Sequence, residues 1–237
     1  MPFKSINTGL RKYGPSLRGR ILILEGLISA GKSTAGKEIK TFVEALGIPC
    51  KFFPEPFVQE LLDLFLSDQK KYAYSFQLTM LVKRQAVYRE AHHWAGQGYF
   101  CIIDRSLYGD YCFALMHKSR GNISDEPASL DKSAISEWQT YLSVLHSEEF
   151  DHPDYVLYLS VTAETAIERC IKRDRSGEKK YDRAYFQELC EVYEKIIPSS
   201  PHKSLEVVDW NEDRETKDIA KCLLDRVRKM YDVAFNL

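Results

Sequence analysis

The stretch that decides the fold is ILILEGLISAGKST, residues 21–34. A β-rich run leads directly into a glycine, and the spacing of Gly26, Gly31, Lys32 and Ser33 fits G-x-x-x-x-G-K-[ST], the pattern of a phosphate-binding loop. Glycines let backbone N–H groups approach phosphate oxygens, and a helix after the loop points its N-terminus at the same anion. The stretch therefore predicts a strand–loop–helix unit in which Lys32 reaches the β- and γ-phosphates and Ser33 offers its hydroxyl to Mg²⁺.

The rest of the chain repeats the alternation of β-rich runs and helical patterns. The further strands expected are CKFF (50–53), YFCIID (99–104), YVLYLSV (155–161) and LEVVDW (205–210). The helices expected are 33–46, 72–95, 106–118, 132–147, 162–173, 183–196 and 213–231. Strands that alternate with helices and are apolar on both faces are typical of a parallel sheet covered on both sides. We therefore predict an α/β fold with a five-stranded parallel sheet flanked by helices.

Composition excludes several classes of function. The 237 residues are 44% apolar and 28% charged, which is ordinary for a globular protein. A net charge of −1 gives no basic stripe, so we expect no nucleic-acid partner. The longest apolar runs are far below the ~20 residues needed to cross a bilayer, so we expect no membrane association.

The N-terminal stretch and the cysteines suggest a reduced intracellular protein. Residues 1–19 are basic, contain no acid and show no clear amphipathic period, so we predict a flexible basic arm before a single domain over 20–237. The six cysteines form no C-x-x-C motif and no cluster with zinc spacing, which favours reduced thiols in the core. Without a secretory signal, the expected compartment is the cytoplasm.

Polar residues stand where the apolar strands stop. In parallel α/β sheets, ligands bind beyond the carboxyl ends of the strands, so these residues should gather at one edge. Glu55 lies between two prolines in FFPEPF and is the candidate general base that accepts a proton from an attacking hydroxyl. Asp104 suits a position near Mg²⁺, and Arg105 can neutralise phosphoryl charge or orient Glu55.

A phosphate loop alone leaves several classes of protein open. A switch GTPase needs NKxD, which does not occur, and the D-R-S-G at 174–177 follows a helical pattern rather than a strand. A thymidylate-like monophosphate kinase needs cationic ligands for the acceptor phosphate near Glu55, and FFPEPFVQE has none. A nucleotide-binding protein without catalysis is disfavoured by the intact set of Lys32, Ser33, Glu55 and Arg105.

Several motifs together resemble one family. LEGLISAGKST, PEP, YAYSFQ, DRSLYGDYCFA and ERCIKRDRSGE occur in the order found in the deoxynucleoside kinases, over about residues 20 to 215. The chain looks most similar to the compact bacterial and viral members of this family, which also includes animal deoxycytidine and deoxyguanosine kinases. The resemblance implies a P-loop kinase fold, ATP as phosphoryl donor, Mg²⁺, the 5′-hydroxyl of a deoxynucleoside as acceptor in nucleotide salvage, and a homodimer.

The resemblance also implies roles on the acceptor side. Glu55 matches the base for the 5′-hydroxyl, Arg105 its partner at that oxygen, and Asp104 an acidic residue near the metal. Gln77 matches the glutamine that pairs with the nucleobase. Arg84 and Asp110 match a couple found in members that act on deoxycytidine and purine deoxynucleosides, so we expect those substrates. Thymidine or a broad range of deoxynucleosides stays open as an alternative.

The spacing on the helical stretch agrees with a shared nucleobase site. Gln77 and Arg84 are two helical turns apart, so they share a face at about 10 Å along the axis. Their amide and guanidinium can both reach one planar base in a pocket lined by Phe76, Tyr74 or Phe113.

On the donor side the resemblance implies a short arginine-rich lid over about 173–182. It assigns Glu178 to the sugar 3′-hydroxyl and makes Arg173 catalytic together with Glu55, Arg105 and Lys32. The residues expected at ATP are Gly26, Ser29, Ala30, Gly31, Lys32, Ser33, Thr34, Arg169, Arg173 and Arg175.

Several positions depart from the family pattern, namely Leu27, Ser29, Glu60, Leu66 and Arg214. Ser29 stands where a glycine is often found, which narrows the allowed backbone angles of the loop. Leu66 stands where a tyrosine usually shares the 3′-hydroxyl with the lid glutamate. The discrimination between deoxyribose and ribose is therefore open.

Overall fold

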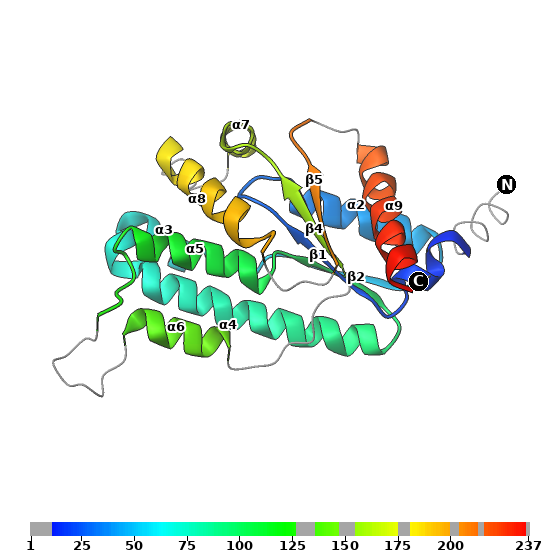
Figure 1. The fold of residues 1–237 in the computed structure, drawn as a ribbon, viewed down its shortest axis with the longest axis horizontal. Helices are drawn as coiled ribbons and strands as arrows, with labels where there is room; N and C mark the ends of the chain where they lie inside the picture. The colour runs from blue at the N-terminus through cyan, green and yellow to red at the C-terminus, as the bar shows by residue number, and fades with distance from the viewer. Residues whose placement is uncertain are drawn as a thin grey trace.

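The computed structural model describes residues 11–126, 136–146, 155–174, 181–199, 204–212 and 216–235, and these form an α/β domain (Figure 1). The strands are β1 (Ile21–Glu25), β2 (Cys50–Phe53), β3 (Phe100–Asp104), β4 (Tyr155–Ser160) and β5 (Leu205–Asp209). They pair in parallel in the order β2-β3-β1-β4-β5. The predicted five-stranded parallel sheet is confirmed, and no predicted strand boundary differs by more than one residue.

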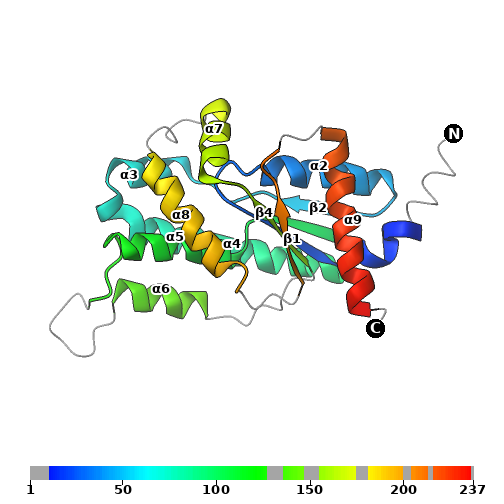
Figure 2. The same cartoon turned by 45° about the horizontal axis from the view of Figure 1, so that its top comes forward.

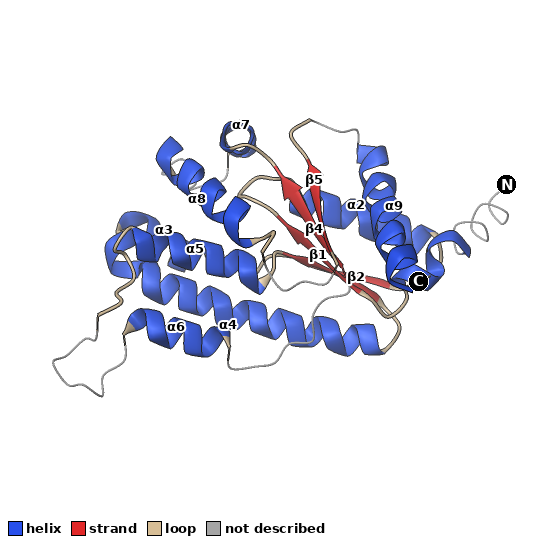
Figure 3. Ribbon diagram, in the orientation of Figure 1, coloured by secondary structure: helices blue, strands red, loops and turns tan. Residues whose placement is uncertain are grey.

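Helices cover both faces of this sheet (Figures 1 and 3). They are α2 (Lys32–Ala45), α3 (Gln59–Ser67), α4 (Gln69–Gly96), α5 (Leu107–Ser119), α6 (Glu137–Leu145), α7 (Ala163–Arg173), α8 (Arg183–Ile196) and α9 (Thr216–Phe235). Helices α2 and α9 lie together on one side, and α4 packs on the other with α3, α5 and α6 against it (Figure 2).

Strand β1 is buried on both faces because its side chains alternate between two hydrophobic clusters. Leu22 and Leu24 belong to the cluster that contains the buried residues of α2 and α9. Ile21 and Ile23 belong to the cluster formed with α3, α4 and α6. This two-sided burial explains why ILILE is a continuous apolar run that ends in one acid.

One helix was not expected from the sequence. Helix α3 follows the two prolines of FFPEPF, is only nine residues long, and begins at Gln59 after Val58, which provides no side-chain cap. Its buried residues Leu62, Phe65 and Leu66 pack in the cluster beneath α4. Only Asp68 separates it from α4, and the Asp68 carboxylate caps α4 by accepting a hydrogen bond from the Lys71 N–H at 3.0 Å. Helix α4 therefore begins three residues before its predicted start.

The chain before β1 is partly packed, which differs from the predicted flexible arm. Residues 11–17 are helical, and Tyr13 and Leu17 are buried. The Tyr13 hydroxyl and the Lys12 ammonium each donate to Asp225 of α9 at 2.7 Å. These contacts hold the second half of the stretch against the domain, while residues 1–10 lie outside the described part of the chain.

The cysteines agree with the expectation of reduced thiols in the core. All six cysteines are free, and all but the half-buried Cys222 are buried. Among the described residues, none of the helices is long and apolar enough to cross a membrane.

Candidate active site

The loop between β1 and α2 has the backbone geometry of an anion cradle. Gly31 has a φ of 94°, and a Cβ on Gly26 would lie 2.8 Å from the Leu159 carbonyl oxygen, so both positions require glycine. Ser29 adopts a φ of 61°, a left-handed conformation that is strained for a residue with a side chain. Helix α2 begins at Lys32, so its free N–H groups face the space enclosed by the loop.

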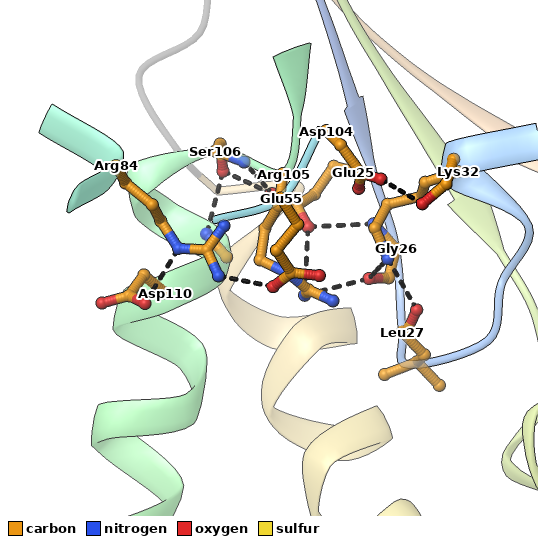
Figure 4. Close-up of polar contacts among 12 residues, drawn as sticks. Glu25, Gly26, Leu27, Lys32, Glu55, Arg84, Asp104, Arg105, Ser106 and Asp110 are labelled. Atoms are coloured by element: carbon orange, nitrogen blue, oxygen red, sulfur yellow. Dashed lines mark hydrogen bonds and ion pairs between the residues drawn. The ribbon is translucent and has the colours of Figure 1, made fainter. Parts of the chain in front are cut away.

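Lys32 holds this loop together in the structure. Its ammonium donates to the carbonyl oxygens of Gly26 at 3.0 Å and Leu27 at 2.8 Å (Figure 4). Burial lowers the pKa of Lys32 to about 8, and the nearby Arg105 acts in the same direction. A phosphate is a stronger acceptor than two carbonyls, so an anion in the loop can draw the ammonium to itself.

Ser33 and Asp104 come together from α2 and β3. The Ser33 hydroxyl donates to Asp104 Oδ2 at 2.5 Å, whereas Asp104 Oδ1 is buried and has no hydrogen-bond partner among the described residues. Burial raises the pKa of Asp104, and the positive charge of Lys32 opposes this shift. A hydroxyl beside a carboxylate with one unsatisfied oxygen fits Mg²⁺, which in kinase sites takes one or two carboxylates together with substrate phosphates. In the described part of the chain no cluster of three or more His, Cys, Asp or Glu side chains could hold a metal ion by itself.

Glu55 is fixed between two arginines. Its Oε1 accepts hydrogen bonds from Arg84 Nη2 at 2.5 Å and from Arg105 Nε at 2.9 Å (Figure 4). Burial alone would raise the pKa of Glu55, but Arg105, Arg84 and Lys32 together hold it well below its usual range. The side chain is still 35% exposed. Glu55 is therefore an ionised and oriented acceptor that a substrate hydroxyl can reach.

Arg84 carries a second contact that extends away from Glu55. Its Nε donates to Asp110 Oδ1 at 3.0 Å, and Asp110 Oδ2 accepts from the Tyr141 hydroxyl at 2.9 Å. Burial raises the pKa of Asp110, and the Arg84 guanidinium opposes this shift. The sequence paired Arg84 with Asp110, and the structure brings them together. The contact between Arg84 and Glu55 was not anticipated.

Arg105 is the most buried cation of the site. Its side chain is 2% exposed, its backbone has a φ of 79°, and its Cζ lies 4.9 Å from the centre of the Phe113 ring. Nη1 donates to the Gly26 carbonyl oxygen at 3.1 Å and lies 3.6 Å from Glu25 Oε1. Glu25 itself accepts from the Gly26 N–H at 2.9 Å and from the Ser106 N–H at 2.7 Å. Glu25 had no predicted role, and the structure uses it to join the end of β1 to the turn that follows β3.

A cavity of about 620 Å³ opens over these groups. The predicted site residues that line it are Ser29, Gly31, Lys32, Ser33, Thr34, Glu55, Gln77, Arg84, Arg105, Asp110, Arg169 and Arg173. Ala30 packs in the hydrophobic core behind the loop. Gln77 Nε2 and Arg84 Nη1, on one face of α4, are buried donors without a hydrogen-bond partner in the part of the chain that the structure describes. Two unsatisfied donors beside the lining residues Phe76 and Phe113 suit a planar ligand rich in acceptors.

Other lining residues differ from the expectation. Tyr74 and Leu66 pack in the cluster around α4 and are not among the described residues that line the cavity. Four further residues line the cavity and were not predicted from the sequence: Lys37, Lys172, Tyr181 and Tyr185. The two lysines belong to mixed-charge helices, where a cation ordinarily indicates a solvated face.

The cationic end of α7 closes the donor side of the cavity. Arg169 and Arg173 both line it, and Arg169 Nη2 donates to the Asn211 carbonyl oxygen at 3.1 Å. The predicted lid residues Arg175 and Glu178 lie outside the described residues. Two of the three arginines expected at ATP therefore line the same cavity as the phosphate loop.

This combination of fold and site defines a P-loop phosphotransferase. The loop, the Ser33–Asp104 pair and the arginines suit a nucleoside triphosphate, and Glu55 lines the same cavity. The chain belongs to the deoxynucleoside kinase family, whose sequence profile matches residues 22–231.

Individual relatives agree with this assignment. The chain is 26% identical to deoxyadenosine kinase of Dictyostelium discoideum, over 88% of this chain and 79% of the relative. It is 27% identical to deoxyadenosine/deoxycytidine kinase of Bacillus subtilis, over 82% and 85% of the two chains. The structure of deoxyadenosine kinase from M. mycoides, which contains the products dCMP and a flexible dCDP, superimposes with a TM-score of 0.69 at 26% identity, covering 88% of this chain and 99% of that one.

Proposed function

We propose that this protein transfers the γ-phosphoryl group of ATP to the 5′-hydroxyl of a deoxynucleoside. The observation that carries the proposal is the position of Glu55, an ionised acid held by Arg84 and Arg105 beside the phosphate loop. The 5′-oxygen forms a bond to the γ-phosphorus, the bond to the β-phosphate oxygen breaks, and the hydroxyl proton passes to Glu55. The products are ADP and the deoxynucleoside 5′-monophosphate.

The remaining cations serve the phosphates. Lys32 and the N–H groups at the start of α2 bind the triphosphate, and Arg105, Arg169 and Arg173 neutralise the charge that the transferred group carries. We assign Ser33 and Asp104 to Mg²⁺, which when bound screens the phosphate charge. Arg175 at ATP and Glu178 at the 3′-hydroxyl complete the lid in this proposal.

We further propose that the acceptor is deoxyadenosine, deoxyguanosine or deoxycytidine. The Arg84–Asp110 ion pair supports this preference, as do relatives named for deoxyadenosine and deoxycytidine. A thymidylate-like kinase would need free cations for the acceptor phosphate. Both arginines beside Glu55 are instead paired with its carboxylate, and Arg84 is also paired with Asp110, which favours an uncharged hydroxyl as the acceptor beside Glu55.

Two further features of the proposal come from the sequence and the resemblance alone. We propose that the protein is a homodimer, which light scattering of the purified chain tests directly. We also propose that it acts in the cytoplasm, which fractionation of cells that produce the full chain tests.

One panel of assays tests the proposed reaction. ATP and Mg²⁺ are offered with each deoxynucleoside, each ribonucleoside and thymidine monophosphate, and both ADP and the nucleotide product are measured. We expect 5′-monophosphates of deoxyadenosine, deoxyguanosine or deoxycytidine. The matched variant Glu55→Gln keeps the size of the side chain and is expected to lower kcat by about 10²- to 10⁴-fold.

Each other result selects a different function. Product from thymidine monophosphate alone would identify a monophosphate kinase. ATP binding without ADP release for any acceptor would identify a nucleotide-binding protein. Turnover by Glu55→Gln within threefold of wild type would remove the acid from the reaction.

A further inference from the structure

We propose that Tyr193 is a positioning residue for Arg105. Its hydroxyl, on α8, sets the direction in which the guanidinium presents its remaining N–H groups to the reacting oxygen. The inference rests on the proposed function, because it concerns the arginine beside the 5′-hydroxyl.

The geometry of Arg105 carries the first step. Nε donates to Glu55, and Nη1 donates both to the Gly26 carbonyl oxygen and to the Tyr193 hydroxyl. A guanidinium is planar, so fixing Nε and Nη1 also fixes the direction of Nη2. Three contacts, from the segment after β2, from the phosphate loop and from α8, therefore leave this side chain one orientation.

The backbone of Arg105 indicates that this orientation matters. Its φ of 79° lies in the left-handed region, which is unfavourable for a residue with a long side chain. Such strain persists only where the surroundings over-determine the conformation, and it clusters at functional sites. The hydroxyl of Tyr193 is one of the groups that hold the side chain of this strained residue.

Tyr193 is itself fixed. Its side chain is fully buried, and its hydroxyl donates to the Gly109 carbonyl oxygen at 3.2 Å. Burial raises the pKa of Tyr193 well above its usual range, so the hydroxyl keeps this proton and presents a lone pair to Arg105. Its ring lies 5.8 Å from Arg105 Cζ, and the Phe113 ring also stacks near the guanidinium. The ring of Tyr193 packs against the Arg105 guanidinium, whereas its hydroxyl orients that guanidinium by accepting a hydrogen bond from Nη1.

Loss of the hydroxyl would leave the packing and release the guanidinium. Nη1 would keep only the Gly26 carbonyl, which Lys32 also uses, and Glu25 Oε1 lies 3.6 Å away as a competing partner. Rotation toward Glu25 would draw Arg105 away from Glu55. The expected consequence is slower chemistry with little change in substrate binding.

The test compares Tyr193→Phe with Tyr158→Phe in the full chain. Tyr158 is the matched control, because it is buried, its ring centre lies 6.2 Å from that of Tyr193, and none of the hydrogen bonds of Arg105 in the described structure involves it. We expect Tyr193→Phe to lower kcat about tenfold, with both KM values within twofold of wild type. The acid limb of its pH–rate profile should move to higher pH, because Glu55 loses part of the cation that lowers its pKa.

A double variant separates positioning from general destabilisation. In an Arg105→Lys background, Tyr193→Phe should change kcat by less than twofold, since the group that it positions is gone. Additive losses would overturn the proposal, as would equal losses of kcat in the two tyrosine variants or a Tyr193→Phe enzyme within twofold of wild type. An inactive wild type would count against the proposed function, whereas an active wild type matched by Tyr193→Phe would count against the positioning role alone.

Discussion

Arg84 donates a 2.5 Å hydrogen bond to Glu55, although the two residues lie on different elements and were expected to serve different parts of the substrate. The same guanidinium is paired with Asp110, the partner associated with the choice of nucleobase. A nucleobase that shifts Arg84 therefore also shifts the acid at the 5′-hydroxyl. Base recognition and phosphoryl transfer should be linked in this site.

Asp110→Asn tests that link. The substitution leaves a buried Arg84 with Glu55 as its remaining charged partner. We therefore expect kcat and kcat/KM for the preferred deoxynucleoside to fall about 10²-fold. The kcat/KM for thymidine, divided by that for the preferred deoxynucleoside, should rise. Stability should fall by about 3 kcal/mol, the usual loss when a buried ion pair is broken. Tyr141→Phe is the milder control, because it removes one hydrogen bond to Asp110 and leaves its charge. A change in KM alone would contradict the link.

The lowered pKa of Lys32 predicts that ATP binding is accompanied by the uptake of a proton. Its pKa in the folded protein is lowered to about 8, so above that pH the folded state holds fewer protons at this site than the unfolded state does. The burial of the charged ammonium therefore lowers the free energy of unfolding by its full amount below pH 8. Between about pH 8 and 10.5 this loss disappears, so the free energy of unfolding rises with pH. A bound triphosphate restores the charge, so ATP binding at pH 8.5 should take up a proton and weaken as the pH rises.

Calorimetry in buffers with different ionisation enthalpies measures this uptake. Lys32→Met should abolish it, along with most of the activity, and should make the free protein more stable at pH 7. Lys40→Met is the matched control, because Lys40 lies on the same helix but pairs with Glu44 on the surface. Equal proton uptake by wild type and Lys32→Met would exclude Lys32 as the titrating group.

The left-handed backbone of Ser29 predicts that its substitution by glycine stabilises the protein. Its left-handed backbone costs about 1–2 kcal/mol, which exceeds the 0.4–1 kcal/mol of unfolded-state entropy that an added glycine costs. Ser29→Gly should therefore raise the free energy of unfolding by about 0.5–1 kcal/mol. Ser29→Ala keeps the strain and removes only the buried hydroxyl, for which the described structure shows no hydrogen-bond partner. Denaturant unfolding that ranks Ser29→Gly below wild type would show that the loop is not strained.

The strands and most of the site were predictable because they depend on local patterns. A strand buried on both faces reads as a continuous apolar run, and ILILE and CKFF have the predicted boundaries. The carboxyl ends of parallel strands meet at one edge, which brought Glu55, Asp104 and Arg105 together from positions far apart in the sequence.

The contacts that were missed depend on side-chain direction in three dimensions. Nothing near Tyr193 in the sequence shows that it contacts an arginine 88 residues away. Helix α3 was missed because it is short and lacks a capping side chain, so its burial against α4 rather than its local sequence stabilises it. The contact of Arg84 with Glu55 likewise follows from the packing of α4 under the sheet.

Arg173 gives the sharpest test of the donor side. It ends α7, lines the cavity and is exposed, so its removal should leave folding unchanged within about 0.5 kcal/mol. A positioned cation on the developing phosphoryl charge is typically worth about 2.7–4 kcal/mol, so Arg173→Ala should lower kcat by about 10²-fold or more. Arg183→Ala is the control, because Arg183 is an equally exposed cation that pairs with Glu164 and is not among the described residues lining the cavity. Since the control loses only a surface ion pair worth about 0–1 kcal/mol, its turnover should match wild type. Turnover of Arg173→Ala within threefold of wild type would remove Arg173 from the mechanism and leave Arg105 and Lys32 to carry the charge.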